Sequence, residues 1–167
     1  MITGAQKWYT VTRTLLDQVL SELSTQVDRS GVVPATISWD NCSCGALYAS
    51  TGLVYISETF PDQRASADLS DACWAPYEVG EVILQLMRCA PVATGQKLAP
   101  SVTELDASAQ MVRQDAYEVM KAVSFKLCAM REAMEIENYI IDTQMPLGPL
   151  GACVGTELRL RVGLQRN

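Results

Sequence analysis

The segment from Tyr77 to Cys89, YEVGEVILQLMRC, constrains the fold of this chain more than any other. From Val82 onward it is almost unbrokenly apolar, which is typical of a strand that is covered on both faces. Gly80 near its start and Pro91 just after its end limit it to the length of a strand rather than a helix. Because such a strand belongs in the interior of a sheet, the pattern predicts that the other elements pack around it.

Two helices are predicted from apolar residues that recur every three or four positions. The first runs from about Thr10 to Val27, and Gly31 marks its end. The second begins after Ser101, which forms the pattern of a capping box with Glu104. Its helical pattern persists toward Ile136, and this length predicts a bend or a division into two helices.

Further strands are predicted where apolar and polar residues alternate. One spans Ala35–Asn41, and another spans Ala46–Thr59 with a bend or bulge at Ser50–Gly52. Near the end of the chain, Tyr139–Ile141 and Thr156–Val162 form a hairpin whose connection is 145–151. Two long loops, 62–76 and 91–100, flank the central strand.

These elements predict one domain that spans residues 1–167. The fold class is α+β: a mostly antiparallel sheet, an N-terminal helix and a long central helix packed on one face, and a C-terminal β-hairpin. The net charge of −6 excludes a large basic patch of the kind that reads nucleic-acid sequence. No apolar run reaches bilayer length, and the first residues lack the apolar core of a signal peptide, so we expect a soluble protein.

The chain contains no histidine. This removes the commonest general base, the Ser-His and Cys-His nucleophile pairs, and the commonest metal ligand. The glycine-rich segment 148–155 lacks the Gly-Lys-Ser/Thr ending of a phosphate loop and leads into a strand. The acidic residues form no carboxylate pair with a defined partner. We therefore predict no enzymatic activity and no cofactor.

Six cysteines are the sharpest local feature. Cys42, Cys44, Cys73 and Cys153 are candidates for disulfides or for metal ligands, and the sequence does not choose a pairing. The spacing differs from the paired C-x2-C pattern of structural zinc sites, which argues against a metal. Cys89 and Cys128 lie on apolar faces and are expected to be small buried hydrophobic residues.

Five short segments occur in a fixed order: 42–45 (CSCG) with 47–48, 58–61 (ETFP), 78–80 (EVG), 88–91 (RCAP) and 146–155 (PLGPLGACVG). In this order they resemble the head-to-tail connector proteins of long-tailed (siphovirus-type) phages that infect actinobacteria, and among these the tail terminator. The resemblance covers about Trp39 to Val162, which is most of the chain. It implies a small α+β subunit of the virion without catalytic activity.

The resemblance also implies partners. A tail terminator forms a homo-hexameric ring that caps the tail tube, contacts the connector proteins of the neck, and lets genomic DNA pass through its lumen without sequence-specific binding. It is assembled in the bacterial host cytoplasm and resides at the head-tail junction of the virion. A net negative charge suits a lumen along which DNA slides. Ring closure needs a heterologous interface, for which Glu157, Arg159 and Arg161 and the loop 62–76 are candidates.

Two other readings remain open. One is a different neck component, although an adaptor is expected to be mostly helical and a stopper to be a small barrel. The other is a metal-binding or redox protein with cysteine ligands, which bound metal or unfolding by a chelator would reveal.

Overall fold

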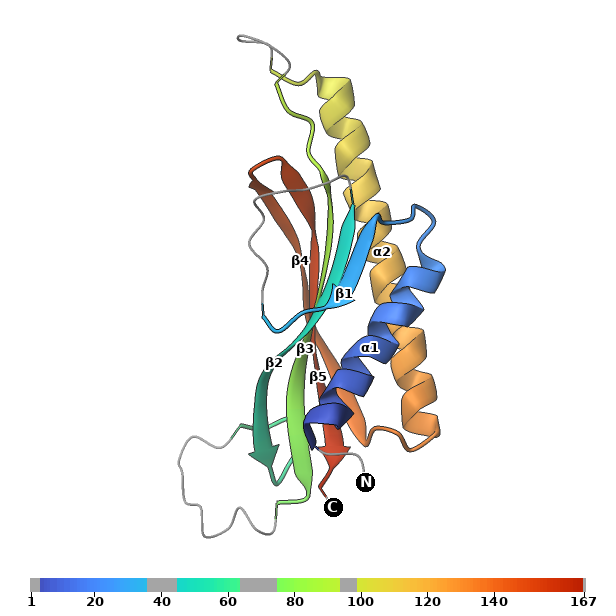
Figure 1. Cartoon of the computed structure of the whole chain (residues 1–167), viewed down its shortest axis with the longest axis vertical. Helices are drawn as coiled ribbons and strands as arrows, with labels where there is room; N and C mark the ends of the chain where they lie inside the picture. Colours follow the sequence, from blue (N-terminus) through green and yellow to red (C-terminus); the bar gives the residue numbers. More distant parts are fainter. Residues whose placement is uncertain (1–3, 36–44, 64–74, 94–98, 167) are drawn as a thin grey trace.

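In the described part of the computed structural model, five strands form one sheet, and two helices pack on the same face of it (Figure 1). The structure describes residues 4–35, 45–63, 75–93 and 99–166. The elements are α1 (Gly4–Glu22), β1 (Arg29–Val32), β2 (Ala46–Ser57), β3 (Tyr77–Cys89), α2 (Val102–Glu132), β4 (Asn138–Leu150) and β5 (Cys153–Gln165). The predicted α+β fold class, with its two helices and C-terminal hairpin, is confirmed.

The strand order is β1-β2-β3-β5-β4, so β3 is the central strand, as predicted. Among the described strands, only the pair β1–β2 is parallel, and the other three pairs are antiparallel. Alternate residues of β3 point to opposite faces of the sheet. Val82, Leu84 and Leu86 belong to the core under the helices, whereas Ile83 and Met87 are buried on the other face. Burial on both faces explains the unbroken apolar run.

The helix α1 spans Gly4–Glu22 rather than the predicted residues from Thr10 to Val27. At its start, Trp8 packs into the core and lengthens the apolar stripe toward the N-terminus. Beyond its end, the backbone bonds to other elements instead of continuing the helix. The N–H of Ser24 donates to Glu118 at 2.9 Å. Arg88 binds the carbonyl oxygens of Thr25 and Gln26. These contacts were not visible in the sequence.

A bend or a division into two helices was predicted for this segment; α2 is one continuous helix, so the division is wrong. The segment contains neither glycine nor proline, the residues that most often interrupt a helix. The capping box is confirmed: Ser101 accepts from the N–H of Glu104, whose carboxylate accepts from the N–H of Ser101. The buried residues of α2 all lie between Asp115 and Met130, so its N-terminal turns are largely uncovered.

The hairpin strands are longer than predicted. The segment 145–151 was expected as the connection, but its residues up to Leu150 belong to β4, and Gly151 and Ala152 join β4 to β5. Prolines 146 and 149 are tolerated because β4 is an edge strand, where a missing N–H need not break a ladder. The bulge predicted in the second strand is confirmed, since the register of β2 against β3 shifts between Thr51 and Val54.

Other predictions were missed or lie outside the described residues. The short strand β1 was not predicted; its four residues lie where a helix end was expected. Residues 36–41 of the predicted strand Ala35–Asn41 lie outside the described residues, as do parts of both predicted long loops, 64–74 and 94–98. Among the described helices, neither is long and apolar enough to cross a membrane.

Candidate functional site

A buried ion pair ties the centre of the sheet to both helices. The guanidinium of Arg88, on the helix-covered face of β3, binds both carboxylate oxygens of Asp115 on α2, at 2.8 and 2.9 Å. Both side chains are about 95% buried. The remaining donors of Arg88 reach the carbonyl oxygens of Thr25 and Gln26 at 2.7 and 3.0 Å. Because the charge is paired and its N–H groups have acceptors, this cluster positions α1, α2 and β3 relative to one another.

The sheet face opposite the helices, called the open face below, carries the three predicted interface residues. Glu157 is buried and accepts from Gln85 at 2.7 Å and from Arg159 at 2.6 Å. Arg159 also lies 3.5 Å from Glu81. The alternation predicted along β5 is confirmed, but Glu157 is 4% exposed, so this part of the face is not the solvated one that the sequence indicated.

Arg161 forms a separate pair on the same face. It binds both carboxylate oxygens of Asp142, each at 2.7 Å. The hydrogen bonds that Arg161 donates to Asp142 raise the pKa of Arg161. In the same way, the hydrogen bond to Glu157 raises the pKa of Arg159. All three predicted interface residues therefore have partners within the subunit. A contact of these residues with a neighbouring subunit would either add to these pairs or replace one of their partners.

A groove of about 530 Å³ lies between the N-terminal half of α2 and the tip of the β4–β5 hairpin. Leu105 and Val112 line its helical wall, and Pro146, Leu147 and Val154 line its sheet wall. The apolar face predicted for α2 is thus covered by the core only in its C-terminal half. In its N-terminal half the same face lines a groove that the described residues leave open.

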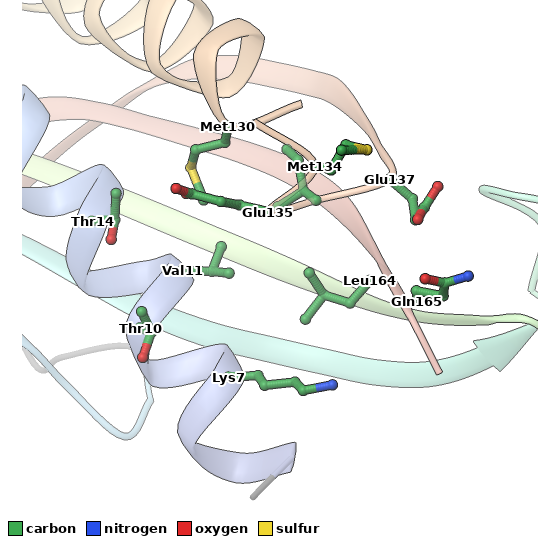
Figure 2. Close-up of a pocket in the computed structure, with 11 residues that line it drawn as sticks. Lys7, Thr10, Val11, Thr14, Met130, Met134, Glu135, Glu137, Leu164 and Gln165 are labelled. Atoms are coloured by element: carbon green, nitrogen blue, oxygen red, sulfur yellow. The ribbon is translucent and has the colours of Figure 1, made fainter. Parts of the chain in front are cut away.

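A second hollow, of about 360 Å³, lies between α1, the turn after α2 and the end of β5 (Figure 2). Val11 and Leu164 form its apolar floor, while Lys7 and Glu135 extend along its sides. Its lining mixes buried core residues, such as Val11 and Leu164, with exposed polar residues such as Thr10 and Glu135. Such a lining is typical of the seam between packed elements rather than of a site with a defined reaction.

The cysteines differ from one another. Cys153 is fully buried and disulfide-bonded. Cys42, Cys44 and Cys73 lie outside the described residues. The predicted burial of Cys89 and Cys128 is wrong, because both are exposed thiols. Cys89 ends β3 on the open face, and Cys128 follows the buried Leu127 on α2, where its sulfur lies 2.9 Å from the hydroxyl of Tyr139.

The described residues contain no cluster of three or more side chains suited to hold a metal ion. The described segments of the ordered motifs contribute packing contacts instead. Gly80 leaves room for the ring of Trp8, and Gly163 lies under the ring of Phe60 from the 58–61 segment. The residues that sequence reasoning missed are Gln85, Asp115 and Asp142, whose partners are distant in the chain. The sequence matches no protein-family model, and no curated protein matches it significantly.

Proposed function

We propose that this protein is a structural component of a phage neck, a tail terminator that forms a hexameric ring. The ring caps the tail tube, joins it to the head connector, and lets DNA pass through its lumen. The protein needs no catalytic group or cofactor for this role. It resides in the virion after assembly in the bacterial host cytoplasm.

The observation that carries the proposal is the presence of two different uncovered surfaces on one small α+β subunit. One is the apolar groove between α2 and the hairpin tip. The other is the second half of β2, where Leu53, Val54 and Ile56 are exposed. A closed ring requires a heterologous interface, in which each subunit presents two different surfaces to its two neighbours. Exposed apolar side chains are the usual core of such an interface.

The ordered motifs support the same function. The 88–91 segment begins with the arginine that binds Asp115, and the 58–61 segment packs over Gly163. The segment 146–155 forms the hairpin tip and contributes to the groove. Segments that serve packing and surface shape, rather than a reactive group, suit a protein whose work is assembly.

Native mass spectrometry of the non-reduced protein, combined with negative-stain electron microscopy, tests the proposal. We expect a metal-free hexameric ring, or a monomer that forms rings once the tail tube protein of the same phage is added. Added tail tube should then stop growing at the capped end. A protein that remains monomeric with tail tube and carries stoichiometric zinc or iron would overturn the proposal and favour the metal-binding alternative. Rings that bind the head connector but not the tail tube would indicate a different neck component.

A further inference from the structure

The sheet ends in two edges that other described strands leave unpaired. β4 is the last strand in the sheet order, and its outer side has no strand partner among the described residues. At the opposite edge, β1 pairs only with Ala46–Ala49 of β2. The second half of β2, Ser50–Ser57, therefore pairs with β3 on one side and with no described strand on the other. Each edge presents backbone N–H and C=O groups to a potential partner.

Neither edge segment has the usual protection against pairing with another chain. Natural edges are commonly blocked by lysine, proline or inward-pointing charges. Residues 138–145 of β4 contain one charged residue, Asp142, which is paired with Arg161, and no proline. Residues 50–57 of β2 contain no charged residue and no proline. Segment 138–145 has one bulge, between Ile141 and Thr143, and segment 50–57 has one, between Thr51 and Val54, whereas the two prolines and the second bulge of β4 lie beyond Met145.

Exposed apolar side chains flank both edges. On β4 these are Ile140 and Met145, and Met145 also lines the groove beside the hairpin tip. On β2 they are Leu53, Val54 and Ile56. Side chains of this kind, placed next to open backbone groups, let strand addition bury apolar area as well as form hydrogen bonds.

The strand directions allow the two edges to meet. β4 is antiparallel to β5, β5 to β3, and β3 to β2, so β4 and β2 run in opposite directions within one subunit. A second copy that continues the sheet with its helices on the same side would place its β2 antiparallel to β4 of the first. Antiparallel pairs are the slightly more stable kind.

We propose that residues 138–145 of β4 pair with residues 50–57 of β2 from a second copy of this chain, so that one sheet continues from subunit to subunit. The pairing rests on the proposed function, since it specifies the interface of the ring. It is heterologous, so it can repeat around a closed ring in which both segments are paired in every subunit. Pairing of β4 with β4 of another copy would instead stop at a dimer and leave both β2 edges open.

Cysteine cross-linking of the full chain tests this pairing. The background carries Cys89→Ser and Cys128→Ser, which remove the two exposed thiols among the described residues. With Ile140→Cys and Leu53→Cys together, a short bis-maleimide should give a ladder of covalent dimers, trimers and larger species. Mass spectrometry should find peptides that join positions 140 and 53 of different copies. The matched control pair, Tyr117→Cys with Phe125→Cys, places two exposed thiols on α2 and should give no ladder.

The other outcomes refute the pairing in distinguishable ways. Dimers from Ile140→Cys alone, joined at 140–140, would show an isologous β4 contact. Rings without any 140–53 peptide would overturn the pairing and leave the terminator function standing. If no ring forms with or without tail tube, both proposals fail.

A second variant provides an independent check. Ile140→Lys adds an edge charge at an exposed position and should abolish the ring in native mass spectra, whereas Phe125→Lys should leave it intact. Unchanged thermal unfolding of both monomers would establish that each variant folds. Full ring formation by a folded Ile140→Lys protein would refute the pairing.

Discussion

Replacing Arg88 with methionine gives the sharpest test of the internal structure. The substitution keeps an unbranched side chain but leaves the carboxylate of Asp115 buried and without its cationic partner. Removing one member of a buried pair typically costs about 3–5 kcal/mol. With a urea m-value of roughly 2 kcal/mol per M, the unfolding midpoint should fall by about 2 M. The carbonyl oxygens of Thr25 and Gln26 also lose their donor, so the segment after α1 should become more exposed to hydrogen exchange.

Equilibrium urea unfolding, followed by circular dichroism, measures this loss. The double variant Arg88→Met/Asp115→Leu removes both charges and should recover much of the lost free energy, because no unpaired charge remains in the core. The control Arg161→Met breaks the pair with Asp142, which is partly exposed, and should cost only about 0–1 kcal/mol. If Arg88→Met lowered the free energy of unfolding no more than Arg161→Met, the pair with Asp115 would not be a buried structural contact. The conclusion that this pair positions α1, α2 and β3 relative to one another would then be wrong.

Two further predictions concern the start of α2 and the packing on the open face. The pKa of Glu104 is lowered by hydrogen bonds from the backbone N–H of Ser101 and, to a smaller extent, from its hydroxyl. The capping box therefore adds stability at pH values above the unfolded-state pKa of Glu104 and loses it as the pH falls through the lower folded-state pKa. In an NMR titration, Ser101→Ala should raise the pKa of Glu104 only part of the way to its ordinary value, because the backbone hydrogen bond remains, and an unchanged pKa would contradict this assignment. Gly163→Ala places a methyl group against the ring of Phe60 and should lower the free energy of unfolding by about 1–3 kcal/mol. In the control Gly31→Ala the added methyl group meets nothing within 4 Å, and the free energy of unfolding should change by less than about 1 kcal/mol. Thermal unfolding compares the two variants, and equal effects would refute the packing of Phe60 on Gly163.

Local patterns predicted the elements that local chemistry determines. The bounds of the central strand match β3, and the capping box placed the start of α2 correctly, because both depend on residues adjacent in sequence. The end of α1 was wrong because the backbone groups after Glu22 bind Glu118 and Arg88, which are distant in the chain.

For the predicted interface residues, too, the local pattern was predicted correctly and the distant partners were not. The alternation along β5 placed Glu157, Arg159 and Arg161 on one face, as the period of a strand requires. Their partners Gln85, Glu81 and Asp142 follow from the register of three strands, which no single segment reveals.

The difference between chain order and sheet order has a consequence for synthesis on the ribosome. Among the described strands β5 follows β4 in the chain, yet in the sheet it lies between β3 and β4. Until residues 153–165 emerge, β3 lacks its neighbour on that side, and β4 has no strand to pair with, because it pairs only with β5 among the described strands. A chain that stops before residue 153 therefore cannot form the β3–β5 pair, and its β4 segment has no described strand to hold it at the edge of the sheet. Under the proposed ring interface, the fold itself would keep incomplete chains out of the assembly.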